Sequence, residues 1–198
     1  MNTVEIFKQI QGDKARVCKL GETAVIQKLT ELGWDAFNAN ASTPNYRGVD
    51  VIAVNPQTLD TIFIQVKASA ETEPNFPTGL VSDTNGSIGE EWEKKIVGPW
   101  VFVHIKLENG EIVYKYYVLT KEEVIWLIGD SNTWYWKQPE RKAKSNSQPI
   151  GLPLCWITGK SEKPKPNRPS FRDYSRSRDI EPEDSWDKIG WLKTPVLG

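Results

Sequence analysis

Residues 47–67 read RGVDVIAVNPQTLDTIFIQVK, and they contain two apolar runs around which the predicted sheet is built. Val49–Val54 and Thr61–Val66 are rich in β-branched residues, and the Asn-Pro pair between them is a turn signal. The stretch therefore predicts two neighbouring strands. Because side chains alternate between the two faces of a strand, Asp50 interrupts an otherwise apolar first strand.

Three polar residues break the apolar pattern of these strands, namely Asp50, Gln65 and Lys67. Buried charges are costly unless they are paired or bound to a metal ion. One interpretation is structural, with an Asp50–Lys67 ion pair and a hydrogen-bonded Gln65. The other is a catalytic site built from the same three groups. The residues of this stretch alone leave both open.

The spacing of these residues resembles the signature of the PD-(D/E)xK nuclease superfamily. Asp50 is followed by fourteen residues and then by Gln65-x-Lys67. The sequence departs from the signature because Gln65 replaces the second acid and Gly48-Val49 precedes Asp50 in place of Pro. Gln-x-Lys is known in Mrr-like restriction endonucleases, and Gly-Val-Asp is similar to the corresponding residues of archaeal Holliday-junction resolvases.

Glu22 is a further candidate for the same site. Gly12–Leu32 has the apolar spacing of a helix that Asp13 caps, and Glu22 lies within its apolar stripe. One explanation is a residue at the edge of the stripe whose carboxylate reaches water. The resemblance implies another, because the first core helix of the superfamily often contributes a Glu to the metal site.

The resemblance implies a Mg²⁺-dependent nuclease that hydrolyses phosphodiester bonds, with Mn²⁺ as a substitute metal. The implied metal ligands are Asp50, Glu22, the side-chain carbonyl of Gln65 and the backbone carbonyl of Val66. Such hard oxygen ligands suit magnesium. Lys67 would orient or deprotonate the attacking water and stabilise the charge of the transition state. The same four side chains, Glu22, Asp50, Gln65 and Lys67, form the predicted catalytic set.

The chain order predicts an α/β fold with a central mixed sheet flanked by helices, similar to the αβββαβ core of the superfamily. Between the predicted strands and Trp100 lie a long irregular stretch and a helix that Ser87 caps. The Asn109-Gly110 pair predicts a hairpin, and Thr120 with Glu123 predicts a short capped helix. The expected elements after the first helix are strands 34–40, 49–54 and 61–66, irregular 68–86, helix 87–97, strands 100–107 and 112–119, and helix 120–128.

The C-terminal third has a different composition. Residues 1–130 form the predicted nuclease-like domain, and residues 131–198 form an aromatic and basic extension that packs on it or extends from it, with one more strand expected near 151–158. Residues 137–178 contain eleven Lys or Arg and three Asp or Glu, a local balance of +8 in a chain whose net charge is −1. Basic residues interleaved with aromatic ones suit phosphate contacts and base stacking. The predicted nucleic-acid contacts are Arg47, Trp134, Trp136, Lys137, Arg141, Lys142 and Lys144.

An alternative for this extension is that its Trp side chains pack on the domain and its charges are solvated. No apolar run approaches the ~20 residues of a membrane span, and two cysteines without a CxxC pair favour a reducing, cytoplasmic compartment. The expected partner is DNA, with RNA and a homodimer left open. The alternative function is a catalytically inactive nuclease-like module, decayed at Gln65, that binds nucleic acid or a protein.

Overall fold

The computed structural model describes residues 2–41, 48–137, 147–160, 170–175 and 179–189. A five-stranded sheet lies at the centre, in the order β1-β2-β3-β5-β6. β3 and β5 are parallel, and the other neighbouring strands are antiparallel. The strands of this sheet are β1 (Asp35–Asn38), β2 (Val51–Val54), β3 (Thr61–Ser69), β5 (Trp100–Glu108) and β6 (Glu111–Leu119).

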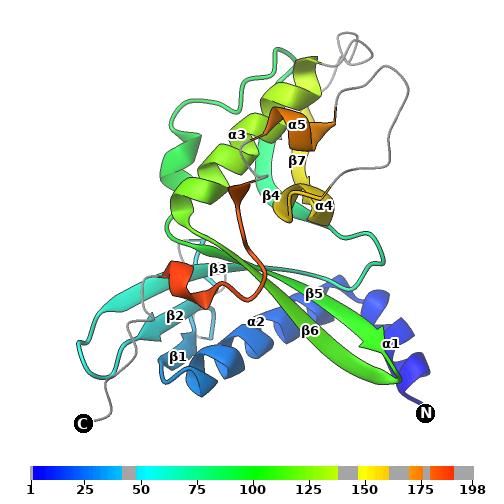
Figure 1. The fold of residues 1–198 in the computed structure, drawn as a ribbon, viewed down its shortest axis with the longest axis vertical. Helices are drawn as coiled ribbons and strands as arrows, with labels where there is room; N and C mark the ends of the chain where they lie inside the picture. The colour runs from blue at the N-terminus through cyan, green and yellow to red at the C-terminus, as the bar shows by residue number, and fades with distance from the viewer. Residues whose placement is uncertain (1, 42–47, 138–146, 161–169, 176–178, 190–198) are drawn as a thin grey trace.

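Helices α1 (Thr3–Gln11) and α2 (Lys14–Glu31) cover one face of the sheet (Figure 1). Asp13 caps α2 as predicted, since its carboxylate accepts a hydrogen bond from the Arg16 backbone. The first core cluster fills this interface with branched aliphatic side chains from α2 and from all but the first strand. Its members include Val25, Leu29, Val51, Ala53, Ile64, Val66, Val101, Val103, Ile105 and Val118.

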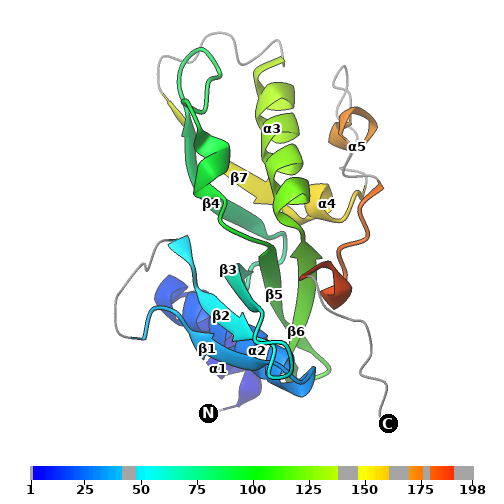
Figure 2. The same cartoon turned by 90° about the vertical axis from the view of Figure 1, so that its left-hand side faces the viewer.

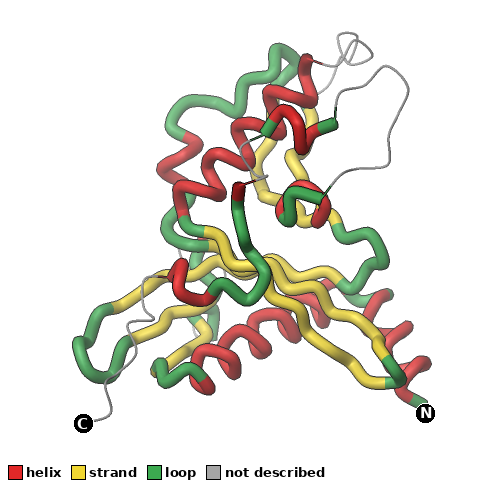
Figure 3. Tube along the Cα trace, viewed as in Figure 1, coloured by secondary structure: helices red, strands yellow, loops and turns green. Residues whose placement is uncertain are grey.

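The opposite face of the sheet carries a second layer, visible in Figures 2 and 3. It consists of α3 (Lys121–Lys137) and an antiparallel ribbon of β4 (Asn75–Ser82) and β7 (Gln148–Pro153), with the short helices α4 (Leu154–Ile157) and α5 (Phe171–Tyr174) beside them. The second core cluster joins this layer to the sheet. It includes Phe76, Trp100, Phe102, Leu119, Leu127, Trp134, Leu152 and Phe171.

The predicted α/β class with a mixed, helix-flanked sheet is confirmed. The connection between the parallel strands β3 and β5 differs from the prediction, because the expected helix at 87–97 is only a 3₁₀ turn at Trp92–Lys95. The Asp83 carboxylate accepts hydrogen bonds from the Asn85 and Ser87 backbone, and Gly89 and Glu91 both have positive φ. These local bonds and dihedrals divert the backbone from a continuous helix.

The stretch predicted as irregular, 68–86, contains β4. Its buried positions alternate, but Thr78 and Ser82 occupy two of them, and Pro77 and Gly79 interrupt the run. The sequence therefore lacked an apolar alternation. Pro77 is compatible with a strand here because the β4–β7 ribbon has only two strands.

Other elements also differ from the predicted ones in number or in bounds. α1 was not predicted, and α3 continues past Ile128 to Lys137, so the expected division between residues 130 and 131 falls inside this helix. The strand expected at 151–158 begins earlier, as β7, and gives way to α4 at Leu154. Trp186, near the C-terminus in a final 3₁₀ turn at Trp186–Ile189, packs in the first core cluster.

Gly21 sets the distance between α2 and β3. A Cβ atom added at Gly21 would lie 2.4 Å from the Cβ of Ala68, a separation that side-chain atoms do not tolerate. We expect Gly21→Ala to lower the free energy of unfolding by about 1–3 kcal/mol through overpacking. Thermal or urea unfolding measures the change.

Gly12→Ala is the matched control, because its new Cβ would meet nothing closer than 3.7 Å. Adding Ala68→Gly to Gly21→Ala removes the clashing atom. The double variant should therefore lose less stability than the two single changes combined. If Gly21→Ala were as stable as Gly12→Ala, helix–strand distance would not depend on Gly21.

Candidate active site

Asp50 lies where β2 begins, at the point where the pairing of β2 with β3 stops. Its backbone N–H donates to the Ile64 carbonyl at 3.0 Å, and its carboxylate Oδ2 accepts from the Val66 backbone N–H at 2.8 Å. The Asp50 side chain thus accepts the hydrogen bond that a backbone carbonyl of a neighbouring strand would otherwise accept from β3. Beyond this residue the edge of β3 is no longer covered by β2, so groups from both faces of the sheet can meet there.

Glu22 reaches this place from α2. Gly21, its neighbour, packs against Ala68 and Val66 of β3, which brings the helix close to the strand. The Glu22 carboxylate Oε2 accepts a hydrogen bond from Asn38 Nδ2 at 2.9 Å. Burial raises the pKa of Glu22 above its usual range, the Asn38 hydrogen bond lowers it, and the negative charge of Asp50 raises it.

Two asparagines that were not predicted connect these carboxylates. Asn38 Oδ1 accepts from the Asn40 backbone N–H at 2.7 Å, and Asn40 Nδ2 donates to Asp50 Oδ1 at 3.2 Å. Asn38 therefore orients Glu22, and Asn40 orients Asp50. The sequence offered only a weak signal, two amides in alternate positions where the predicted strand 34–40 ends.

Lys67 approaches Asp50 from β3. It is half-buried, and its Nζ lies 5.1 Å from the centre of the Trp100 ring on β5. Burial lowers the pKa of Lys67 below its usual range, while the negative charge of Asp50 and the Cys18 thiol raise it. Gln65 is half-buried two residues earlier, so it lies on the same face of β3 as Lys67.

Cys18 lies on α2, one helical turn before Glu22. Burial raises the pKa of its thiol, as do the charges of Glu22 and Asp50, whereas Lys67 lowers it. The charges of Glu22, Asp50 and Lys67 therefore all shift the pKa of this exposed cysteine. The structure brings together Glu22, Asp50 and Lys67, with Asp50 acting electrostatically on both of the others.

The chemistry of the oxygen groups fits a hard cation. Within the described part of the chain, no three His, Cys, Asp or Glu side chains converge as a metal site, so the candidate set has two carboxylates. Glu22 Oε1 accepts no hydrogen bond from the described residues, and the charge of Asp50 opposes ionisation of Glu22. A divalent cation between two such carboxylates would relieve their repulsion.

The structure describes three of the seven predicted nucleic-acid contacts. Trp134 was expected to stack on bases, but it is 1% exposed and packs edge-on against Trp156 and Phe171, so the structure corrects this expectation. Trp134 belongs to the buried side of α3, which also carries Val124, Leu127 and Ile128. Trp136 is half-buried, and Lys137 is exposed at the end of α3. Arg47, Arg141, Lys142 and Lys144 lie outside the described residues.

His104, the sole histidine, lies on β5 away from these groups in the chain. Its Nε2 lies 2.9 Å from the Glu71 carbonyl oxygen, and burial lowers the pKa of its ring. This contact ties β5 to the segment after β3, a structural role.

The raised pKa of Glu22 predicts how stability responds to pH. The folded state binds this proton more tightly than the unfolded state, so ionised Glu22 costs stability once pH exceeds the folded pKa. We expect Glu22→Gln to be more stable than the wild type at neutral pH without added metal. The advantage should vanish below 4.5, the ordinary value, where both side chains are neutral.

Glu31→Gln, at an exposed position of the same helix, serves as the control. Melting temperatures recorded across the acidic-to-neutral range for all three proteins make the test. A pH-independent difference between Glu22→Gln and the wild type would show that ionisation of Glu22 does not lower the stability of the folded state.

No family model matches the chain, and no curated protein matches it. Among solved structures, a bacterial homing endonuclease aligns with 84% of this chain and 89% of its own, at 14% sequence identity and a TM-score of 0.34. A likeness of this size does not establish a family or a shared activity. None of the helices among the described residues is both long and apolar enough to cross a membrane.

Proposed function

We propose that this protein is a metal-dependent nuclease that hydrolyses phosphodiester bonds in DNA. One observation carries the proposal: Glu22, Asp50 and Lys67, far apart in sequence, come together where β2 begins, and Asp50 acts electrostatically on the other two. A purely structural ion pair would need Asp50 and Lys67 alone. It would not explain a second carboxylate brought beside the first and held there by Asn38.

Asp50 and Glu22 would hold a Mg²⁺ ion, together with the Gln65 side-chain carbonyl and the Val66 backbone carbonyl. Bound there, the ion would activate water and neutralise negative charge on the phosphate. Asn38 and Asn40 keep the two carboxylates oriented through hydrogen bonds to one oxygen of each. The Val66 N–H fixes the other Asp50 oxygen.

Lys67 supplies the second chemical role. Because its burial lowers the pKa of the ammonium group, Lys67 releases a proton more readily than an exposed lysine does. The neutral amine can accept a proton from the attacking water, and the charged form stabilises the negative transition state. Because Asp50 acts electrostatically on Lys67, both roles would operate beside the proposed metal ligands.

The proposal of DNA as substrate rests on charge and on the site chemistry. Residues 137–178 have a balance of +8, and Lys137 begins this segment at the end of α3. Lys137 donates to the Tyr174 hydroxyl at 3.2 Å, and its Nζ lies 5.0 Å from that ring. Such cationic segments favour polyanions and make binding depend on salt concentration.

Substitution of the central residues tests the activity. Asp50→Asn keeps an acceptor for the Val66 N–H but removes the charge, so we expect loss of Mg²⁺-dependent cleavage of plasmid DNA. Lys67→Ala should reduce turnover by roughly 10²–10⁴-fold, the range of a lost general base, and should leave DNA binding intact.

Lys115→Ala, a lysine of β6, is the matched control and should cleave at the wild-type rate. The assay is repeated with Mn²⁺, with chelator and with RNA. If Asp50→Asn and Lys67→Ala cut as well as Lys115→Ala, the site assignment is wrong. Preferential cutting of RNA would replace DNA as the substrate.

Gln65→Glu tests the alternative of an inactive nuclease-like module. That alternative is favoured by the finding of only two converging carboxylates within the described residues. A third carboxylate should strengthen Mg²⁺ binding, seen as a larger rise in melting temperature on adding Mg²⁺. If the wild type lacks cleavage and Gln65→Glu gains it, the natural protein is the inactive module. If Mg²⁺ stabilises both proteins equally, Gln65 does not contact the metal.

A further inference from the structure

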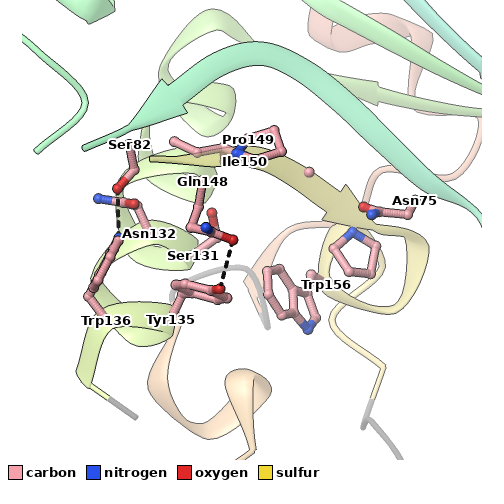
Figure 4. Close-up of a pocket in the computed structure, with 12 residues that line it drawn as sticks. Asn75, Ser82, Ser131, Asn132, Tyr135, Trp136, Gln148, Pro149, Ile150 and Trp156 are labelled. Carbon is pink, nitrogen blue, oxygen red and sulfur yellow. Dashed lines mark hydrogen bonds between the residues drawn. The ribbon is translucent and has the colours of Figure 1, made fainter. Parts of the chain in front are cut away.

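A pocket of about 200 Å³ lies between α3 and the β4–β7 ribbon, in the layer that covers the second face of the sheet (Figure 4). α3 contributes Ser131, Asn132, Tyr135 and Trp136. The ribbon contributes Asn75, Ser82, Gln148, Pro149, Ile150, Gly151 and Pro153, and Trp156 closes the wall from α4. None of these residues is among the proposed catalytic residues Glu22, Asp50, Gln65 and Lys67.

The lining of the pocket is uncharged. No Asp, Glu, Lys, Arg or His is among its described residues, although the chain contains twenty-five basic and twenty-six acidic residues. A phosphate, a carboxylate or a metal ion would lack a counter-charge there. The lining therefore selects a neutral group.

Three aromatic rings line the pocket, those of Tyr135, Trp136 and Trp156, and contacts within the protein hold both indole rings in place. Trp136 Nε1 donates to Ser82 Oγ at 2.6 Å, and its ring lies against Gly86, where a Cβ would be 3.0 Å from Trp136 Cγ. Trp156 stacks on Phe171 with ring centres 4.3 Å apart. The indole faces are thus preorganised by hydrogen bonding and packing.

Three amide side chains provide donors and acceptors around these rings. Asn132 Nδ2 donates to the Gly86 carbonyl at 2.7 Å, which fixes the orientation of an amide that is only 8% exposed. The Tyr135 hydroxyl lies 3.4 Å from Gln148 Oε1. Asn75 lies over Gly151, where a Cβ would be 2.6 Å from Asn75 Oδ1. Asparagine and glutamine amides match the hydrogen-bonding edges of nucleobases.

The volume restricts the size of the ligand. Pockets for drug-sized molecules are about 300–1,000 Å³, so this pocket suits one small planar group. Neutral lining, fixed indole faces and amide edges together describe a site for a single nitrogen heterocycle. Enzymes that accept a base turned out of its stack use the same combination of stacking and edge hydrogen bonds.

We propose that this pocket binds one nucleobase of a nucleic-acid strand, turned out of its stack, and thereby positions the strand relative to the catalytic cluster. This inference rests on the proposed nuclease function. Lys67 lies over Trp100, a member of the second core cluster, so Lys67 and the pocket are on the same face of the sheet. A base held in the pocket would anchor the strand on that face.

Binding to three matched DNA duplexes tests the inference, in chelator and in the Lys67→Ala background so that no DNA is cut. The first duplex is fully paired, the second has one unpaired base, and the third has an abasic site at that position. The abasic duplex keeps the flexible backbone and lacks only the heterocycle. We expect tighter binding of the unpaired-base duplex by roughly 5- to 150-fold, the range for one base–aromatic stack.

Trp136→Leu and Asn75→Ala should remove this preference, the first by loss of the stacking face and the second by loss of an edge amide. Asn75 is exposed, so its replacement tests the pocket even if Trp136→Leu unfolds. Trp126→Ala is the control, since this tryptophan is 43% exposed on the same helix and does not line the pocket. It should keep the preference.

Equal affinity for the unpaired-base and abasic duplexes would overturn the inference. The nuclease function is tested separately, and it would still hold if cleavage of DNA depended on Lys67. A preference that survives both pocket substitutions would also overturn it. Free deoxynucleosides are titrated by calorimetry as a separate arm. If they bound as tightly as the unpaired-base duplex, the ligand would be a free nucleoside and not a base in a strand.

Discussion

The capture of the Val66 backbone N–H by the Asp50 carboxylate is the constraint on which the site depends. It ends the pairing of β2 with β3 without leaving a buried donor unsatisfied, which would be costly. β3 then continues beyond β2, and among the described strands it pairs with β5 along Gln65–Ser69. The end of β2 pairing therefore lies next to a fixed carboxylate, and Glu22 and Lys67 approach this place from α2 and β3.

The charges at this edge oppose folding. Burial disfavours the ionised forms of both Glu22 and Lys67, and Asp50 adds repulsion for Glu22. Apolar packing on the α2 face, with Leu29, Val51 and Ile64 fully buried, supplies the stability that holds them there. Such locally unfavourable electrostatics in a well-packed framework are typical of functional sites.

The two faces of the sheet have different roles in this arrangement. The face toward α1 and α2 is an aliphatic core that sets the position of Glu22 through the close approach of Gly21 to Ala68. The other face carries Lys67, the aromatic second core and the uncharged pocket between α3 and the β4–β7 ribbon. The proposed catalytic site at the strand edge and the proposed base pocket in the second layer would therefore share one sheet.

Local periodicity and turn residues were enough to predict the central strands and the helix that Asp13 caps. The grouping of Asp50, Gln65 and Lys67 was expected from the resemblance of their spacing to the nuclease signature. Glu22 stood out within an apolar stripe, and the same resemblance implied its place in the site. The folded structure was needed to show that Asn38 and Asn40 hold the carboxylates, that β4 is a strand, and that Trp134 is buried while Trp136 lines a pocket. Those outcomes depend on partners distant in the chain, such as β7 for β4 and Phe171 for Trp134, which no local pattern encodes.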